Sequence, residues 1–167
     1  MTDNKKAMAL GFFDGIHVGH AALLKRTKER AAEIGAVPSV LTFDVHPDTL
    51  VFKKNIPLIN SAYDREDIIK RCFGIEDILF IHFSQRIMHM DWQEFIDNLI
   101  AEMNLVWIVV GHDFCFGYKG LGTAEKLKAH CEKLGVGCDI IPAVRRDGSV
   151  VSSTIIRELI QSGNIKK

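Results

Sequence analysis

The sequence predicts an α/β protein built on a parallel sheet of about five strands. Short apolar or β-branched runs alternate with longer segments of helical periodicity, a pattern typical of parallel strands joined by crossover helices. The chain has 167 residues, of which 47% are hydrophobic and 25% are charged. That composition is ordinary for one globular domain, and the length is sufficient to bury a sizeable core. We therefore expect a single domain over residues 1–167.

Five apolar segments are expected to form the strands. Each is short enough to lie buried within a sheet. In chain order they are Ala7–Phe12, Val37–Phe43, Asp77–Phe83, Leu105–Val110 and Cys138–Pro142.

Helices are expected between and after these strands. In the first, Ala21, Leu24, Ala31 and Ile34 share one face, and Gly35 is a plausible stop. The later helices are expected at Tyr63–Cys72, Trp92–Met103, Ala124–Leu134 and Thr154–Gln161. The apolar residues of the third helix are spaced as core residues rather than as a cofactor platform.

Two segments lack clear periodicity, Asp44–Asn60 and Gly111–Thr123, and both directly follow expected strands. Loops that leave the carboxyl ends of strands carry the ligands in open α/β sheets. We therefore expect both segments to border a binding site.

Charge and composition exclude several classes of function. The 21 basic and 21 acidic side chains cancel, which argues against a nucleic-acid clamp or a polybasic membrane binder. No apolar run approaches the roughly 20 residues that cross a bilayer, so we expect a cytoplasmic protein. The four cysteines form no C-x-x-C pair, which favours reduced thiols over disulfides or a zinc site.

The first motif that suggests chemistry follows the first strand and reads Gly11-Phe-Phe-Asp-Gly-Ile-His-Val-Gly-His20. Its two histidines, His17 and His20, are three residues apart where a helix begins, which places both rings on one face. Free N–H groups at a helix N-terminus attract phosphate, and a glycine between the histidines lets a ligand approach the backbone. The alternatives are a tight turn with ordinary polar histidines, or a zinc site that lacks a recognisable third ligand.

A second motif, Val150–Arg157, precedes the last helix. Ser152, Ser153 and Thr154 are all competent N-cap residues, which is the simplest interpretation. The same hydroxyl and N–H groups also suit a polyphosphate. Arg157, one turn further on, has a planar charged group that can reach the same ligand.

Four spaced motifs together resemble the FMN adenylyltransferase module of bacterial FAD synthetase. They are G-x-F-D-G-x-H-x-G-H, T-F-D-x-H-P at Thr42–Pro47, G-x-D-F-x-F-G at Gly111–Gly117, and V-S-S-T-x-x-R at the end. The resemblance runs in the family's order from Ala9 to Gly163. It implies an HxGH nucleotidyltransferase with a Rossmann-like open parallel sheet of about five strands and helices on both faces. Such an enzyme joins FMN to the AMP moiety of ATP, yields FAD and pyrophosphate, and uses Mg²⁺ with the ATP.

The resemblance also implies which residues form the site. The catalytic set would be His17, His20, Ser153, Thr154 and Arg157. Other residues at the ATP would be Gly11, Phe12, Gly19, Gly111 and Asp113. Asp113 is the candidate Mg²⁺ ligand, since carboxylate oxygens suit that ion better than imidazole does. The flavin would meet Phe43, His46, Pro47, Phe116 and Tyr118.

Some alternatives stay open. Val45 replaces the family's usual proline, and Cys115 stands where arginine is frequent, so the acceptor could be another small phosphorylated molecule. A non-catalytic flavin- or nucleotide-binding module is a further alternative. The family usually adds a C-terminal riboflavin kinase domain with a P-T-A-N motif. This sequence lacks that motif, so we expect no riboflavin kinase activity from it.

Overall fold

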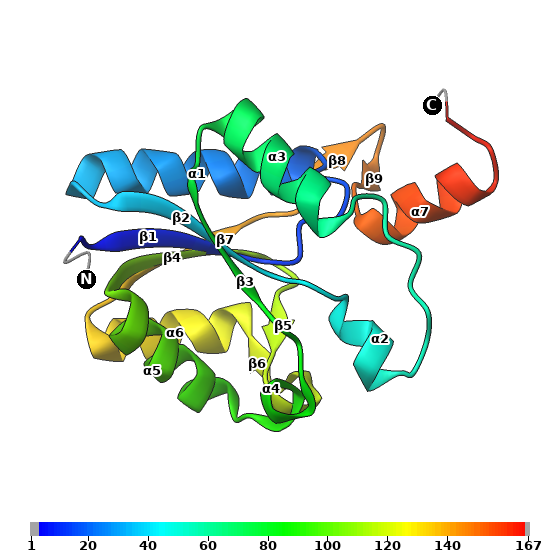
Figure 1. Cartoon of the computed structure of the whole chain (residues 1–167). Helices are drawn as coiled ribbons and strands as arrows, with labels where there is room; N and C mark the ends of the chain where they lie inside the picture. Colours follow the sequence, from blue (N-terminus) through cyan, green and yellow to red (C-terminus); the bar gives the residue numbers. More distant parts are fainter. Residues whose placement is uncertain (1–3, 166–167) are drawn as a thin grey trace.

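Five parallel strands form the central sheet of the computed structural model, which describes residues 4–165 (Figure 1). They are β1 (Lys6–Leu10), β2 (Val37–Phe43), β3 (Asp77–Ile81), β4 (Leu105–Gly111) and β7 (Gly137–Ile141). Their order across the sheet is β3-β2-β1-β4-β7, and every neighbouring pair is parallel. The predicted sheet is confirmed, and every strand begins and ends within two residues of its predicted bounds.

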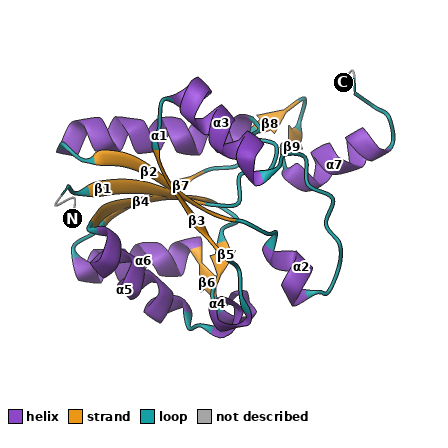
Figure 2. Cartoon of the chain, in the orientation of Figure 1, coloured by secondary structure: helices purple, strands orange, loops and turns teal. Residues whose placement is uncertain are grey.

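Helices cover both faces of this sheet (Figure 2). One face carries α1 (Val18–Ile34) and α3 (Ala62–Phe73), and the other carries α5 (Trp92–Met103) and α6 (Ala124–Leu134). The last helix, α7 (Ser153–Gln161), lies beside these layers rather than within them. All five expected helices are therefore present, and α5 and α6 have the predicted bounds.

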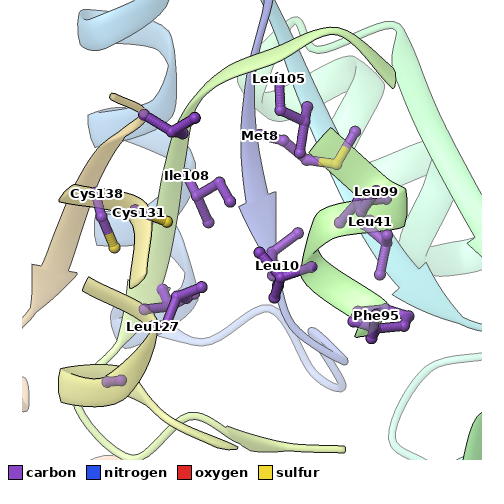
Figure 3. Close-up of a cluster of buried hydrophobic side chains, with 14 residues drawn as sticks. Met8, Leu10, Leu41, Phe95, Leu99, Leu105, Ile108, Leu127, Cys131 and Cys138 are labelled. Atoms are coloured by element: carbon purple, nitrogen blue, oxygen red, sulfur yellow. The ribbon is translucent and has the colours of Figure 1, made fainter. Parts of the chain in front are cut away.

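The core divides between the two faces because successive residues of a strand point to opposite sides. Met8 and Leu10 of β1 pack with Phe95 and Leu99 of α5 in one cluster (Figure 3). Ala9, between them in sequence, packs in the other cluster, under α1 and α3. The expectation that the apolar stripe of α5 is core is confirmed for Phe95 and Leu99.

Several short elements lie between the main strands and helices. Of these, a hairpin turn is indicated in the sequence by Arg145-Arg146-Asp147-Gly148, and the others were not expected. The segment predicted as a loop after β2 contains α2 (Pro47–Val51), and α4 (Gln85–His89) follows β3. The segment after β4 folds into β5 (Cys115–Phe116), a single 3₁₀ turn η1 (Tyr118–Gly120) and β6 (Gly122–Thr123). A hairpin of β8 (Arg145–Arg146) and β9 (Ser149–Val150) precedes α7. Each is too short to give a periodic pattern in the sequence.

The strand order places a switch point between β1 and β4. From β1 the chain moves outward through β2 to β3, and then returns to the other side of β1 to form β4. Ligands of open α/β sheets bind at such a point, outside the carboxyl ends of the strands. Here that edge faces α2 and α7 (Figure 1).

No helix in the described part of the chain is both long and apolar enough to cross a membrane. Among the free cysteines, Cys72 and Cys115 are exposed, and Cys131 and Cys138 are buried.

Candidate active site

Two adjoining cavities open at the carboxyl ends of β1 and β4. The first, the polar cavity, has a volume of about 440 Å³ and is lined by both motif histidines and by the start of α7. The second, the apolar cavity, has a volume of about 620 Å³ and lies between α2, α4 and the β5–β6 segment. The two share a wall formed by Leu10, Gly11, Phe43, Pro47, Asp48, Phe114 and Cys115.

The structure brings the expected ATP residues together although they come from both ends of the chain. The polar cavity is lined by His17, His20, Ser153, Thr154 and Arg157, and also by Gly11, Phe12, Gly19, Gly111 and Asp113. Of the expected flavin residues, Phe116 and Tyr118 line the apolar cavity, and Phe43 and Pro47 line both. His46 lies at the polar cavity, where its ring meets Phe12 edge-on.

His17 caps helix α1 with its own ring. Its Nδ1 accepts hydrogen bonds from the N–H groups of Gly19 at 3.1 Å and His20 at 3.4 Å. The ring fits because residue 19 is glycine: a Cβ there would lie 2.9 Å from Cε1 of His17. The expectation that these N–H groups are free for phosphate is therefore wrong. Since Nδ1 accepts, the neutral ring carries its proton on Nε2, where it can donate.

His20 lies behind His17 and is more deeply buried. The two rings stack with their centres 3.7 Å apart, and Phe13 meets His20 edge-on. Burial, with a smaller contribution from His17, lowers the pKa of His20 to about 3, against an opposing effect of Asp14. Burial also lowers the pKa of His17, opposed by Asp113 and Asp14. Both rings are therefore neutral at pH 7, and His17 acts as a hydrogen-bonding group rather than as a cation.

The neutral state of His20 predicts loss of stability in acid. The unfolded chain protonates this histidine below about pH 6.5, whereas the folded chain keeps it neutral until about pH 3. In that window the unfolded state binds more protons, so stability falls as the pH decreases. Between pH 7 and pH 4.5, we expect the free energy of unfolding of His20→Gln to fall by about 2 to 3 kcal/mol less than that of the wild type.

Urea denaturation at each pH measures this difference. His89→Gln, which changes an exposed histidine, is the control and should lose as much stability as the wild type. Equal acid losses in the wild type and in His20→Gln would contradict a buried neutral ring.

Asp14 is a site residue that the sequence reasoning missed. Its side chain is 1% exposed and forms an ion pair with Arg157 at 2.8 Å. Nε and Nη2 of Arg157 both donate to the same carboxylate oxygen, at 3.0 and 2.8 Å. Asp14 stands inside the first motif, directly between Phe13 and Gly15, and an acidic residue in an apolar run was the available signal.

Arg65 of α3 is a second missed residue, and it is fully buried. Its guanidinium donates to the carbonyls of Phe12 and Phe43 at 2.7 and 3.0 Å, and to the hydroxyl of Thr42 at 2.8 Å. It also lies 4.2 Å from the ring centre of Phe12. Arg65 thus connects two segments. One is the loop after β1, which borders the polar cavity, and the other is the end of β2, which borders both cavities.

The apolar cavity owes its shape to the segment after β4. The rings of Phe114 and Phe116 stack with centres 4.9 Å apart, and Phe116 also packs on Trp92. Gly117 has φ 74°, and a Cβ there would lie 2.5 Å from Cβ of Trp92, so the backbone can approach α5 this closely only at a glycine. The final glycine of G-x-D-F-x-F-G is therefore a packing requirement.

The residues at the polar cavity can support a metal that arrives with a substrate. Within residues 4–165 no group of three His, Cys, Asp or Glu side chains is placed to hold a metal ion. Since Nδ1 of His17 caps the helix, only its Nε2 could meet a metal ion. Asp113 offers one carboxylate, 79% exposed, at the cavity. Mg²⁺ commonly binds in this way, through one or two carboxylates, substrate phosphates and water.

Comparisons with known proteins give a family and several similar chains. The model of a family described as FAD synthetase matches residues 1–155. The bifunctional riboflavin kinase/FMN adenylyltransferase of Listeria monocytogenes is 30% identical, over 99% of this chain and 53% of its own length. That of Bacillus subtilis is also 30% identical, over 97% of this chain and 51% of its own. The chain thus spans about half the length of these relatives.

A solved structure is similar over nearly the whole chain. The crystal structure titled macrolide-efflux protein from Streptococcus pneumoniae aligns with a TM-score of 0.86 and 32% identity. The alignment covers 99% of this chain and 54% of that one.

Proposed function

Because the chain belongs to the FAD synthetase family, we propose that it transfers the AMP moiety of ATP to FMN and yields FAD and pyrophosphate. The observation that carries the proposal is the shared wall of the two cavities. The polar cavity suits a triphosphate, and the apolar, aromatic-lined cavity suits a flavin ring. A common wall allows the FMN phosphate to lie next to the α-phosphate of ATP.

The reaction needs no nucleophile from the protein. A phosphate oxygen of FMN attacks the α-phosphorus of ATP and forms the new P–O bond. The bond from that phosphorus to the bridging oxygen breaks, and its electron pair leaves with pyrophosphate. Catalysis then depends on positioning and on stabilising the negative charge.

Neutral hydrogen-bond donors would supply much of that stabilisation. His17 would donate from Nε2, since its Nδ1 is occupied by the helix N–H groups. Arg157 would contribute the permanent positive charge at the opposite wall. Its Nη1 makes no hydrogen bond to any residue between 4 and 165, so that nitrogen is available to a phosphate oxygen.

Mg²⁺ would accompany ATP, and Asp113, whose exposed carboxylate lies at the polar cavity, would hold it. When bound, the ion offsets the charge of the phosphates that must come together. The protein's own part is to present this exposed carboxylate at the mouth of the polar cavity.

A panel of acceptors tests the proposal. Purified protein with MgATP should release pyrophosphate and form FAD with FMN, but not with riboflavin, which lacks the attacking phosphate. Glycerol 3-phosphate and nicotinamide mononucleotide report on other phosphorylated acceptors. Reaction with one of these and not with FMN would overturn the flavin assignment. Binding of ATP and FMN without pyrophosphate release would favour a non-catalytic binding module.

A charge placed in the apolar cavity should impair FMN binding selectively. Val51 lines this cavity and is partly exposed, so Val51→Asp should fold normally. We expect KM for FMN to rise about 10- to 100-fold, with KM for ATP nearly unchanged, because an apolar contact is replaced by a carboxylate. Steady-state kinetics measure both constants.

Leu134→Asp is the matched control, because Leu134 is similarly exposed on α6 and lies away from both cavities. An unchanged KM for FMN in Val51→Asp would place the flavin elsewhere.

A further inference from the structure

Helix α7 makes its hydrogen bonds to the rest of the described chain through Asp14. None of its side chains is fully buried. Within residues 4–165, the hydrogen bonds from α7 to other segments all end on Asp14. Oγ of Ser153 donates to its backbone carbonyl at 2.8 Å, and Arg157 donates twice to its carboxylate. The residues that α7 presents to the polar cavity therefore share one polar anchor.

Asp14 is itself held rigidly. Its carboxylate accepts hydrogen bonds from the N–H groups of Ile59 and Asn60, each at 2.9 Å. Its neighbours Phe13 and Gly15 have φ 61° and 83°, so the turn around it is in the left-handed region on both sides. The anchor thus connects the end of β1, the segment before α3, and α7.

A buried carboxylate near a triphosphate needs an explanation, because its charge repels the ligand. Here Arg157 and two backbone N–H groups compensate the charge. The arginine approaches side-on through Nε and Nη2, which fixes the plane of the guanidinium and leaves Nη1 unused. The carboxylate thus orients the group that would meet the phosphates.

We propose that Asp14 is a positioning residue that acts through α7 and sets Ser153 and Arg157 at the polar cavity. The inference rests on the proposed adenylyl transfer, because it assigns Asp14 a role in that reaction. Asp14 touches neither substrate nor reacting atoms in this role. Its loss should therefore lower turnover only through the residues that it holds.

A double-mutant cycle tests this route. We expect Asp14→Asn to lower kcat/KM for ATP at least 10-fold and Arg157→Ala to lower it about 100-fold, with KM for FMN unchanged in both. The double variant should be no worse than Arg157→Ala, within about twofold, because the two residues act as one unit. Losses that multiply in the double variant would overturn the proposal.

Asp139→Asn is the matched control. It breaks another partly buried pair between an aspartate and an arginine, that of Asp139 with Arg30 at 2.7 Å, away from both cavities. Its kcat/KM should stay within about twofold of the wild type. An equal loss of kcat/KM in Asp139→Asn and Asp14→Asn would mean that breaking any such ion pair lowers activity. That result would overturn the proposal.

Hydrogen exchange gives a readout that does not require turnover. In both Asp14→Asn and Arg157→Ala, backbone amides of α7 should exchange at least about 10-fold faster, while those of the sheet stay protected. Arg157 belongs to α7, which lies beside the sheet and its covering helices, so Arg157→Ala provides this test even if Asp14→Asn does not fold. Unchanged exchange of α7 in Arg157→Ala would overturn the anchor. If the α7 amides exchange faster in these variants but the wild type forms no FAD, the result supports the anchor and rejects the proposed function.

Discussion

His17→Asn is expected to lower kcat for FAD formation about 100- to 1,000-fold while the fold stays nearly as stable. The variant removes the Nε2–H donor, and loss of one preorganised donor to a developing negative charge typically has an effect of about this size. Asparagine is also a good N-cap residue, so its side-chain oxygen can replace Nδ1 as the acceptor at the start of α1. The substitution thus separates the two functions of one ring.

Pyrophosphate release and urea denaturation, measured on the same preparation, test this expectation. His130→Asn, a histidine that pairs with Asp97 away from both cavities, is the control and should retain turnover. If His17→Asn lost stability and turnover together, the ring would serve the helix start alone. Near-wild-type kcat would remove His17 from the mechanism.

Arg65→Ala should have the largest effect on stability, a loss of about 3 to 5 kcal/mol in the free energy of unfolding. The change leaves a cavity beneath Phe12 and Phe80 and removes the guanidinium donors to the carbonyls of Phe12 and Phe43. The Phe12 carbonyl keeps the hydroxyl of Thr42 as a donor, at 2.8 Å. Burial lowers the pKa of Arg65, opposed by Asp14 and Asp44, so removal of the charge relieves part of the loss. We expect packing and hydrogen bonding to outweigh that relief.

Two further variants on α3 sharpen this test. Arg65→Met keeps most of the side-chain volume but no donor, and should lose less stability than Arg65→Ala. Arg71→Ala changes an exposed arginine of the same helix and should stay within about 0.5 kcal/mol of the wild type. Equal stability of Arg65→Ala and Arg71→Ala would show that the buried guanidinium contributes nothing.

The fold could be predicted because its signals are local. Each strand is a short apolar run, and helices such as α5 repeat their apolar residues along one face. Arg65 could have been found in the same way, since it precedes the buried Ile69 by one helical turn and so shares its face. An arginine on that face predicts a buried hydrogen-bonding role.

The remaining features of the site depend on contacts that no local pattern contains. Asp14 and Arg157 are 143 residues apart in the chain, and only the folded sheet brings them together. The cap that His17 provides depends on how its ring turns back onto the backbone of Gly19 and His20. The motif indicated a helix start and two adjacent rings, but not that the first ring occupies the helix N–H groups.

Labelled ATP tests the central claim, adenylyl transfer from ATP to the phosphate of FMN, most directly. Parallel reactions with FMN and MgATP carry ³²P at either the α- or the γ-position, and the flavin and pyrophosphate products are separated by chromatography. We expect the α-label to appear in FAD and the γ-label only in pyrophosphate, with one FAD formed for each pyrophosphate released. Label from the γ-position in the flavin, or pyrophosphate release without α-labelled FAD, would contradict the account.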